Sequence, residues 1–365
     1  MPKNYPFEIF LRGDREFKAA LNGKTGRAPV YAQMHEFVFR QRGIPPAVFF
    51  NQPEILVTSS LEVQAEYGLD VSNLTFDVYN IEAQGLGQAI ILDDAQQPEI
   101  DRSKPLVRTQ NDLRRVRTPD FAHAGRFSFV VEILKLHSAL TGVQPVLRFC
   151  APFTLAAALR GLQPLIEDIY TDPQFSHELF TRITDEVLAP YLLYQKEQIP
   201  QATTANGADA LASLPIVNLK MLQEWCAPYI RRLQSLTGLN ITVSNWVGER
   251  HLKDPLPMLD LKLSLSDGLI LGQDPDVAAL GPERYQSYAE ERGAALILGV
   301  GAAFLAQASP EQIRQRVQQY IQAGGRGGRF ALYLCYIGVE TPPQNLRAAV
   351  EAAHRTTIEN PGKLF

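Results

Sequence analysis

Residues 74–87 read LTFDVYNIEAQGLG, and they show a pattern that recurs along the rest of the chain. A short apolar run, residues 74–76, stops at a polar cluster that contains Asp77, Tyr79, Asn80 and Glu82. A buried barrel strand ends in this way, because packing fixes the strand while the residues just past its carboxyl end are free to face a pocket. Either carboxylate alone is typical of an ordinary loop, so the functional interpretation rests on repetition of the pattern.

Eight apolar runs end in this manner, and helical segments separate them. Strands that alternate with helices run parallel and are joined by right-handed crossovers. The sequence therefore predicts an α/β fold, a (β/α)8 TIM barrel with an N-terminal helical extension, whose active site lies at the carboxyl ends of the strands. The eight predicted strand ends lie near His35, Asp77, Cys150, Asp209, Asn245, Gln273, Gly299 and Cys335.

Helix signals support the same order of elements. Asp172 followed by Pro173 is typical of an N-cap and a first helical residue, and Ser309-Pro310-Glu311-Gln312 is typical of a capping box. Long helices are predicted to begin at Pro173 and at Lys220. Residues 93–117 predict a surface excursion, and GGRGG at 324–328 predicts a turn rather than a nucleotide loop. We expect one domain over residues 1–365, with a lead-in of about 1–27.

Composition argues against several classes of function. The 365 residues are 45% hydrophobic, which is enough for a large core, and the formal charge is −4. The most basic stretch, residues 112–117, is short and mixed, so no nucleic-acid partner is expected. Three widely spaced cysteines indicate a reducing compartment. No run of about 18 apolar residues predicts a membrane span, and we expect a cytoplasmic protein.

A series of short phrases along the chain carries a family resemblance. These are, in order, RAPV at 27–30, YGLD at 67–70 with Asp77 and EAQG at 82–85, FCAPFTL at 149–155, Asp172-Pro173, GAD at 207–209 and TPPQNL at 341–346. Together they resemble the uroporphyrinogen decarboxylase superfamily, and the similarity covers nearly the whole chain. The resemblance implies a (β/α)8 barrel, in agreement with the independent strand count.

The founding activity of that family is a poor fit to this chain. Family members that decarboxylate porphyrinogens bind the substrate carboxylates with arginines in a motif that reads roughly Met-Arg-Gln-Ala-Gly-Arg, but residues 33–38 here read QMHEFV. Alanines at 156–158 stand where a tyrosine is expected, although Asp77 matches the pocket aspartate. Without those arginines, the negative charge of a substrate with eight carboxylates would be poorly compensated. A decarboxylase with an altered substrate remains an alternative.

A second branch of the family moves methyl groups to or from corrinoid proteins. Its thiol-acting members hold zinc with His-x-Cys-Gly and a last-strand cysteine; Cys335 matches the latter, but residues 245–248 read NWVG. One cysteine cannot hold zinc alone, so zinc is possible but doubtful, through Cys335 with His35, Glu36 or Glu340. The resemblance then implies the first component of an O-demethylase, which transfers methyl from a small, methoxylated aromatic donor to a corrinoid protein.

This chemistry needs an apolar slot, a proton donor and a mouth wide enough for a corrinoid. We expect Asp77 and Cys335 to converge on one hollow that lacks cationic anchors. His137 is expected on a helix face, and Glu249 and His251 at the rim or in water. The candidate residues for catalysis are Asp77, His35 and Glu36, with Glu82 as a further proton donor. Those for substrate binding are Tyr79, Asn80, Phe149, Cys150, Asn245, Trp246 and Tyr336, with Tyr31 and Phe153 as further aromatic walls and Asn206 to orient polar substituents. Cys335 and Glu340 are the candidates for a metal.

The expected partners are the small aromatic methyl donor and a corrinoid protein that carries cob(I)alamin, with no nucleic acid and no membrane; a homodimer is left open. A barrel that binds a tetrapyrrole or corrinoid without chemistry is the alternative from a different functional class.

Overall fold

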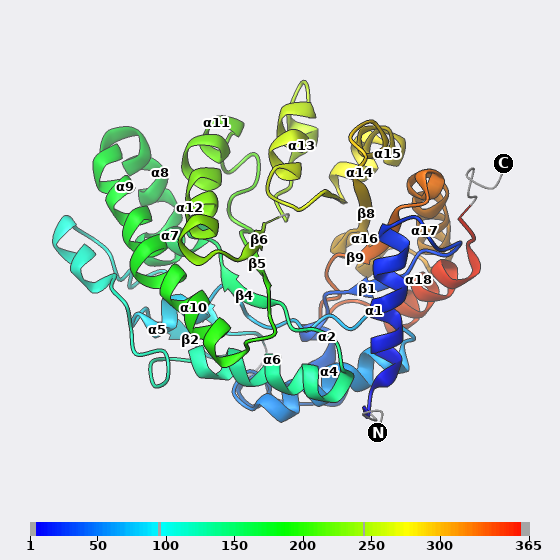
Figure 1. The fold of residues 1–365 in the computed structure, drawn as a ribbon, viewed down its shortest axis with the longest axis horizontal. Helices are drawn as coiled ribbons and strands as arrows, with labels where there is room; N and C mark the ends of the chain where they lie inside the picture. Colours follow the sequence, from blue (N-terminus) through cyan, green and yellow to red (C-terminus); the bar gives the residue numbers. More distant parts are fainter. Residues whose placement is uncertain (1–4, 94–95, 244, 359–365) are drawn as a thin grey trace.

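Parallel strands ringed by helices make up the structure (Figure 1), a computed structural model that describes residues 5–93, 96–243 and 245–358. Each strand pair in the two main sheets is parallel, as βαβ connections require. The first sheet has the order β1-β9-β8-β7 and the second β4-β5-β6. The strands are β1 (Val30–Ala32), β4 (Leu147–Cys150), β5 (Thr204–Ala208), β6 (Asn240–Thr242), β7 (Leu269–Gln273), β8 (Ala295–Val300) and β9 (Phe330–Leu334). The predicted α/β barrel is thereby confirmed.

The segment predicted as the second barrel strand, residues 70–76 with the apolar run 74–76 at its end, is not paired as a strand. Beside β1, the backbone N–H of Asp70 donates to the carbonyl oxygen of Val30 at 3.0 Å. The next bond comes from a side chain, because Nδ2 of Asn73 donates to the carbonyl oxygen of Ala32 at 3.0 Å. A side-chain amide thus replaces the ladder, and the prediction of a regular strand here is wrong.

Helices cover the outside of the strands (Figure 1). No helix among the described residues is both long and apolar enough to cross a membrane. In chain order the helices are α1 (Glu8–Leu21), α2 (His35–Arg42), α3 (Pro46–Phe49), α4 (Pro53–Glu66), α5 (Ile81–Gly85), α6 (Phe127–Thr141), α7 (Pro152–Arg160), α8 (Leu162–Thr171), α9 (Pro173–Arg182), α10 (Ala189–Gln198), α11 (Leu219–Met221), α12 (Ala227–Thr237), α13 (Leu256–Leu263), α14 (Asp276–Leu280), α15 (Pro282–Glu291), α16 (Ala302–Gln307), α17 (Pro310–Gly324) and α18 (Pro343–Arg355).

The predicted caps of two helices are confirmed. Asp172 accepts a hydrogen bond from the Phe175 N–H, and Ser309 and Gln312 form a reciprocal capping box. The two long predicted helices are interrupted by π turns, Ile183–Leu188 and Leu222–Cys226. Each π turn precedes a proline near the start of the next helical segment, in α10 and α12. Proline has no N–H to continue the ladder, so the hydrogen-bond register changes there.

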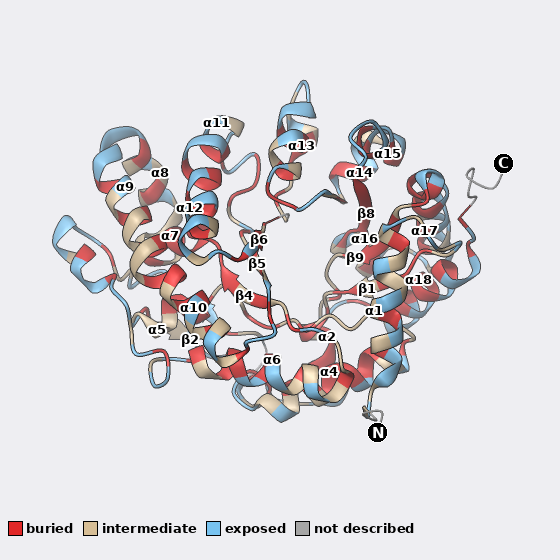
Figure 2. Ribbon diagram, in the orientation of Figure 1, coloured by how far each residue is buried: buried red, intermediate tan, exposed pale blue. Residues whose placement is uncertain are grey.

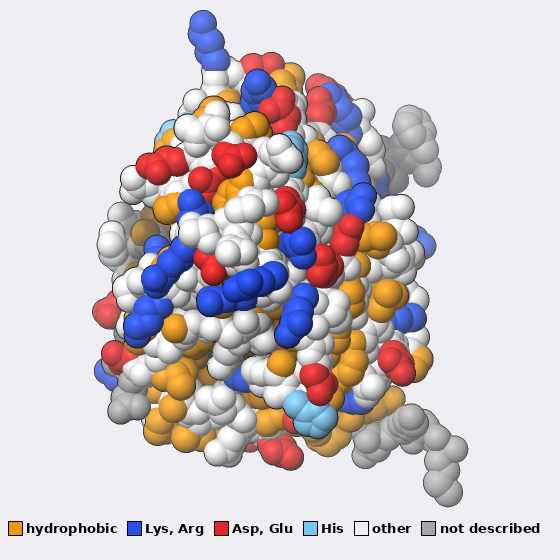
Figure 3. All heavy atoms as spheres, turned by 90° about the vertical axis from the view of Figure 1, so that its left-hand side faces the viewer, with side chains coloured by type: hydrophobic (Ala, Val, Ile, Leu, Met, Phe, Trp, Pro, Cys, Tyr) orange, Lys and Arg blue, Asp and Glu red, His pale blue; other side chains and the backbone are white. Residues whose placement is uncertain are grey.

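The predicted surface excursion, residues 93–117, carries little regular structure. A 3-10 turn at Gln110–Arg115 is the longest element within it, and the short strands β2 (Ile90–Ile91) and β3 (Glu99–Ile100) pair antiparallel at its beginning. The arginines of the mixed run are exposed on this side of the molecule. Figure 3 shows acidic side chains interspersed with the basic ones on that face.

Burial alternates along several strands, so their two faces have different surroundings (Figure 2). β1 and β5 alternate between buried and partly accessible residues, whereas β8 and β9 are buried throughout. Residues that face the helices are fully covered, and those that face the barrel axis on β1, β4 and β5 keep some accessible surface. Side chains therefore do not fill the barrel axis completely beside these strands.

The N-terminal extension covers the amino-terminal end of the barrel. Phe17 and Leu21 of α1 pack against the axial cluster that contains Tyr31 and Tyr333, and the rings of Phe17 and Tyr31 meet edge to face at 5.6 Å. Nε of Arg329, just before β9, donates to the Leu21 carbonyl oxygen at 3.0 Å. The helix end is thus held where the strands begin, opposite the predicted active site.

Candidate active site

Asp77 lies in a buried network just past the unpaired second segment. Nη1 of Arg126 donates to its Oδ1 at 2.9 Å, and Nη2 donates to its Oδ2 at 2.5 Å. Nδ2 of Asn80 also donates to Oδ2, at 3.1 Å. Both oxygens thus accept hydrogen bonds from N–H groups of Arg126 and Asn80, and both are engaged within the protein. The structure therefore does not support Asp77 as a catalytic acid and makes it a positioning group, with Asn80 as its neighbour.

Arg126 was not among the residues predicted from the sequence. Its guanidinium puts a cation beside Asp77, which contradicts the expectation of a hollow without cationic anchors. It also donates to Oε1 of Gln84 at 2.7 Å and to the Phe50 carbonyl oxygen at 3.1 Å. The preceding Gly125 has φ of +51°, and a Cβ there would lie 2.8 Å from Cα of Gly85. The signal available in the sequence was this glycine, two residues before an apolar helix. Its positive φ and the close approach of the two backbone segments exclude residues with a side chain.

The ends of β1 and β9 bring His35, Glu36 and Tyr336 together, as predicted from their strand positions. The His35 and Tyr336 rings are 5.9 Å apart, and the Tyr336 hydroxyl is hydrogen-bonded to Glu36. Burial, followed by that bond, raises the pKa of Tyr336, so the phenol keeps its proton at neutral pH. Glu36 is the acceptor of this bond, which does not support its predicted role as a proton donor.

His35 is buried, and burial lowers its pKa, so the imidazole is neutral near pH 7. Nε2 lies 2.9 Å from Oε1 of Gln97. With Nε2 as donor to this oxygen, Nδ1 carries a lone pair, and it has no partner among the described residues. The Nδ1 lone pair can therefore accept a hydrogen bond, while the Nε2 proton is already donated to Gln97. Gln97 belongs to the surface excursion, and no local pattern distinguished it.

Tyr79 faces a second polar group. Nδ2 of Asn245 donates to the Tyr79 hydroxyl at 3.4 Å, while Oδ1 of Asn245 accepts from the Asp209 N–H at 3.0 Å. Nε1 of Trp246 donates to Oδ2 of Asp209 at 3.1 Å. Burial raises the pKa of Tyr79 and raises the pKa of Asp209 to about 6. Tyr79 thus keeps its proton and can donate a hydrogen bond to a bound oxygen.

Four residues predicted to contact the substrate lie in the packed core instead. Phe149 faces the helices, and a Cβ on neighbouring Gly207 would lie 2.5 Å from its ring. Phe149, Phe153 and Trp246 are fully buried. Cys150 is also fully buried, with its thiol pKa raised by burial. These positions do not support the substrate contacts predicted for them, because a substrate can touch only atoms that an opening exposes.

Glu82 is fully buried between α5 and β4. Its Oε1 accepts from the Cys150 N–H at 2.9 Å, and its Oε2 has no partner among the described residues. Burial raises the pKa of Glu82 to about 8, so the side chain is largely protonated at neutral pH. Because neither oxygen reaches solvent, Glu82 is a structural carboxyl group.

Replacing Glu82 by glutamine is expected to change how stability depends on pH. A raised folded-state pKa means that the native state binds the proton more tightly, so wild-type stability falls as pH rises from about 4.5 to about 8. The variant cannot lose this proton and avoids that fall. Urea unfolding should show the wild type losing up to about 1.4 kcal/mol per pH unit relative to the variant between pH 5.5 and 7.5. Parallel pH profiles of the two proteins would contradict this assignment.

A polar band crosses the barrel axis below the strand ends. The Tyr31 and Tyr333 rings stack at 4.7 Å, and the Tyr333 hydroxyl donates to Oε1 of Gln33 at 3.0 Å. On the facing strands, Nη1 of Arg148 donates to Oδ1 of Asn206 at 2.9 Å. Asn206 in turn donates to the Thr242 hydroxyl at 3.0 Å. Tyr31 was predicted as an aromatic wall and Asn206 as a residue that orients polar substituents, and the structure places both on the axis.

Cys335 follows β9 and faces the same axis, but it does not join a metal site. Its thiol fits against Gly299, which leaves no space for a side chain there, and burial raises the pKa of Cys335. Glu340 is exposed. Within the described ranges, no three His, Cys, Asp or Glu side chains form a group that could hold a metal ion. The donors present among the described residues therefore do not fit zinc.

The two residues of the charged loop that were expected at the rim or in water take different positions. Glu249 is fully buried, and Nζ of Lys262 donates to its Oε1 at 2.6 Å. His251 faces solvent as expected. The charged loop thus predicted exposure for Glu249 although a buried lysine partner was available. His137, which shares a helix stripe with apolar residues, is buried with Nε2 at 2.9 Å from the Ser72 hydroxyl.

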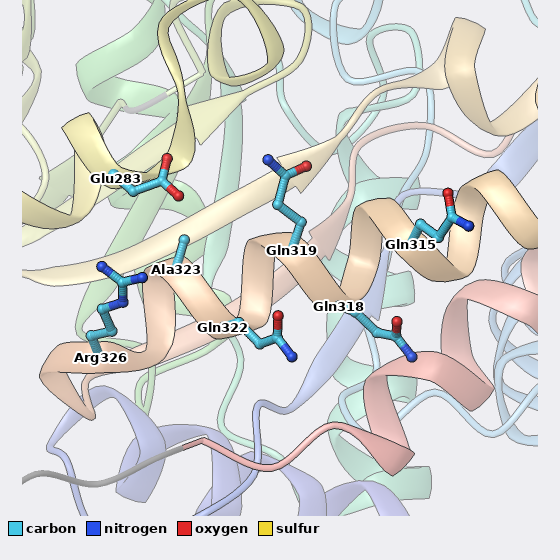
Figure 4. Close-up of a pocket in the computed structure, with 7 residues that line it drawn as sticks. All are labelled: Glu283, Gln315, Gln318, Gln319, Gln322, Ala323 and Arg326. Carbon is cyan, nitrogen blue, oxygen red and sulfur yellow. The ribbon is translucent and has the colours of Figure 1, made fainter.

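Surface hollows elsewhere carry no comparable chemistry. The pocket in Figure 4 lies on the outer helix layer between α15 and α17, away from the strand ends. Its side chains are neutral amides apart from Ala323, Glu283 and Arg326. Gln319 points toward Glu283, whereas Gln318 points away from it. None of the predicted site residues lines this pocket, so it is not the candidate active site.

Comparison with known proteins identifies the family. The model of the family described as "Uroporphyrinogen decarboxylase (URO-D)" matches residues 12–356. The chain belongs to the uroporphyrinogen decarboxylase family. Within this family it is 24% identical over 322 residues to a methylated-thiol–coenzyme M methyltransferase from Methanosarcina mazei, covering 83% of this chain and 76% of the relative. The family resemblance and a distant relation to the methyltransferase branch are therefore confirmed.

The fold of this family member also matches a solved structure, described as a methyltransferase from Methanosarcina mazei. The TM-score is 0.74 at 18% sequence identity, and the match covers 95% of this chain and 98% of the other. At this identity the likeness concerns the fold, and it supports the barrel assignment despite the unpaired second segment.

Proposed function

We propose that this chain is a methyltransferase that moves a methyl group from a small, methoxylated aromatic donor to a corrinoid protein. The relation to a methylated-thiol–coenzyme M methyltransferase supports methyl transfer. The observation that carries the aromatic donor is the barrel interior, where Tyr31 and Tyr79 keep accessible surface beside the stacked Tyr333. Planar substrates favour such aromatic walls.

A corrinoid carried by its own protein would supply the cobalt nucleophile that takes the methyl group from the donor. As the bond between the methyl carbon and the donor oxygen breaks, negative charge develops on that oxygen. Tyr79 is a protonated phenol whose oxygen accepts a hydrogen bond from Asn245, so its own O–H can donate to the departing oxygen. The Tyr336 O–H is already donated to Glu36, so Tyr336 contributes its ring to the site.

A methyl-transfer assay tests the proposal directly. Purified protein is mixed with a cob(I)alamin source and 4-methoxybenzoate, anisole or a methylated thiol, and methylcobalamin is followed by its absorbance. Methylcobalamin formation from a methoxylated aromatic, together with the demethylated phenol, is the expected result. Transfer from the methylated thiol alone would contradict the aromatic donor. Corrinoid binding without transfer from any donor would instead assign the barrel to a non-catalytic binding role.

A decarboxylase with an altered substrate is the second candidate, and one observation favours it. Arg148 projects a cation toward the barrel axis, where a substrate carboxylate could bind. Release of carbon dioxide from the same aromatic acid, measured in the absence of any corrinoid, would select this alternative over methyl transfer.

A further inference from the structure

We infer that Arg148 binds an anionic group, a carboxylate in the first instance, on the small organic substrate of this barrel. That this substrate is the methyl donor rests on the proposed function. Arg148 would then determine substrate specificity from within strand β4, deeper in the barrel than the strand ends where the proposed transfer takes place.

Strand β4 places Arg148 on the barrel axis. Arg148 is paired in register with Asn206 of β5, which is paired with Thr242 of β6, and these three side chains form one hydrogen-bonded row. The flanking Phe149 points the opposite way, into the helix layer. A charged residue in the apolar run VLRFC therefore faces the interior of the barrel instead of the surface.

No carboxylate compensates this cation. Among the described residues, Asn206 supplies its hydrogen-bond acceptor, and no Asp or Glu makes an ion pair with it. Other buried cations are paired: Arg126 with Asp77 at 2.5 Å and Lys262 with Glu249 at 2.6 Å. A buried charge without a counter-ion is costly. Arg148 differs from these two cations because no described carboxylate pairs with it, so an anionic ligand would stabilise its charge.

The surroundings of Arg148 leave its charge available. Burial raises the pKa values of Tyr31 and Tyr333, so both phenols beside Arg148 stay neutral and cannot act as counter-ions. Burial also lowers the pKa of Arg148, as expected for a cation held out of water, while an arginine still remains charged at neutral pH. Arg148 keeps accessible surface within the barrel.

A planar guanidinium recognises a carboxylate through two parallel hydrogen bonds. Asn206 occupies Nη1, which fixes the plane of the group and leaves Nε and Nη2 to a ligand. An aromatic acid bound in this way would place its ring between the axial tyrosines and Tyr79. Its methoxy group would then lie toward the strand ends. The geometry thus favours an elongated substrate with its anion at the bottom of the barrel.

Equilibrium binding tests the inference without any chemistry. Calorimetric titration compares 4-methoxybenzoate with 4-methoxybenzamide, which has nearly the same shape and no charge, on wild type, R148M, R148K and the surface control R292M. The wild type and R292M should bind the acid about tenfold to hundredfold more tightly than the amide. R148M should lose that preference while binding the amide as before, and R148K should retain only part of it.

Stability provides a second readout that a purely structural arginine would not give. Removing an uncompensated buried charge should leave the unfolding midpoint of R148M equal to or above that of the wild type. Equal binding of acid and amide by the wild type would overturn the inference, as would an R148M chain that unfolds or that keeps the acid preference. Acid preference without methylcobalamin formation would remove the proposed function and leave the anion site standing.

Discussion

Replacing Arg126 by methionine is expected to lower the free energy of unfolding by about 3–5 kcal/mol. The guanidinium donates to both oxygens of Asp77, and the two side chains are 8% and 0% exposed. Methionine leaves the carboxylate buried with Asn80 as its remaining donor. The cost is that of an unpaired charge held away from water. Urea unfolding monitored by circular dichroism measures it directly.

The chain provides a matched control for this experiment. Arg232 forms the same two-pronged contact with Asp185, at 2.6 and 2.5 Å, but its side chain is 49% exposed. Arg232→Met should therefore cost about 1 kcal/mol or less. Combining Arg126→Met with Asp77→Asn should recover part of the loss, since the unpaired charge is then gone. Equal losses for the two arginine variants would contradict the role assigned to burial.

Replacing Tyr79 by phenylalanine is expected to slow methyl transfer about 10²-fold, with little change in the KM for the donor. The hydroxyl is expected to donate to the oxygen that acquires charge as its bond to methyl breaks, and Asn245 orients it. Its effect therefore falls on the transition state more than on binding. The measurement is the initial rate of methylcobalamin formation over a range of donor concentrations.

Tyr191 supplies the control for this substitution. It is a fully buried tyrosine in α10 whose hydroxyl has no partner among the described residues. Tyr191→Phe removes the same atom away from the strand ends, and its transfer rate should match that of the wild type. A Tyr79→Phe enzyme with wild-type rate would exclude the hydroxyl from the reaction.

The barrel could be predicted from the sequence because its signals are local. Apolar runs such as that of β8 are buried on both faces, and caps such as Asp172 mark helix starts within a few residues. The second strand was predicted wrongly because the Asn73 side chain takes the place of a backbone donor. Nothing in the apolar run at 74–76 distinguishes an extended segment from a paired one.

The candidate site was harder to predict, since its contacts join distant residues. Arg126 is 49 positions from Asp77, and Gln97 is 62 positions from His35, so neither pairing leaves a local pattern. Arg148 was different, because a lone charge inside a buried strand was visible in the sequence. Apolar patterning placed Phe149 on a strand correctly, but it did not show which face of the sheet the ring occupies.

Closure of the barrel by α1 constrains the order of events in a catalytic cycle. Phe17 and Leu21 pack at the amino-terminal end, so ligands reach the axis through the opposite mouth, the surface that the corrinoid protein of the proposed function would cover. Under that proposal the small donor would load before the large acceptor docks, and the demethylated product would leave only after the acceptor has departed. Excess acceptor protein would consequently slow turnover by occupying the empty enzyme.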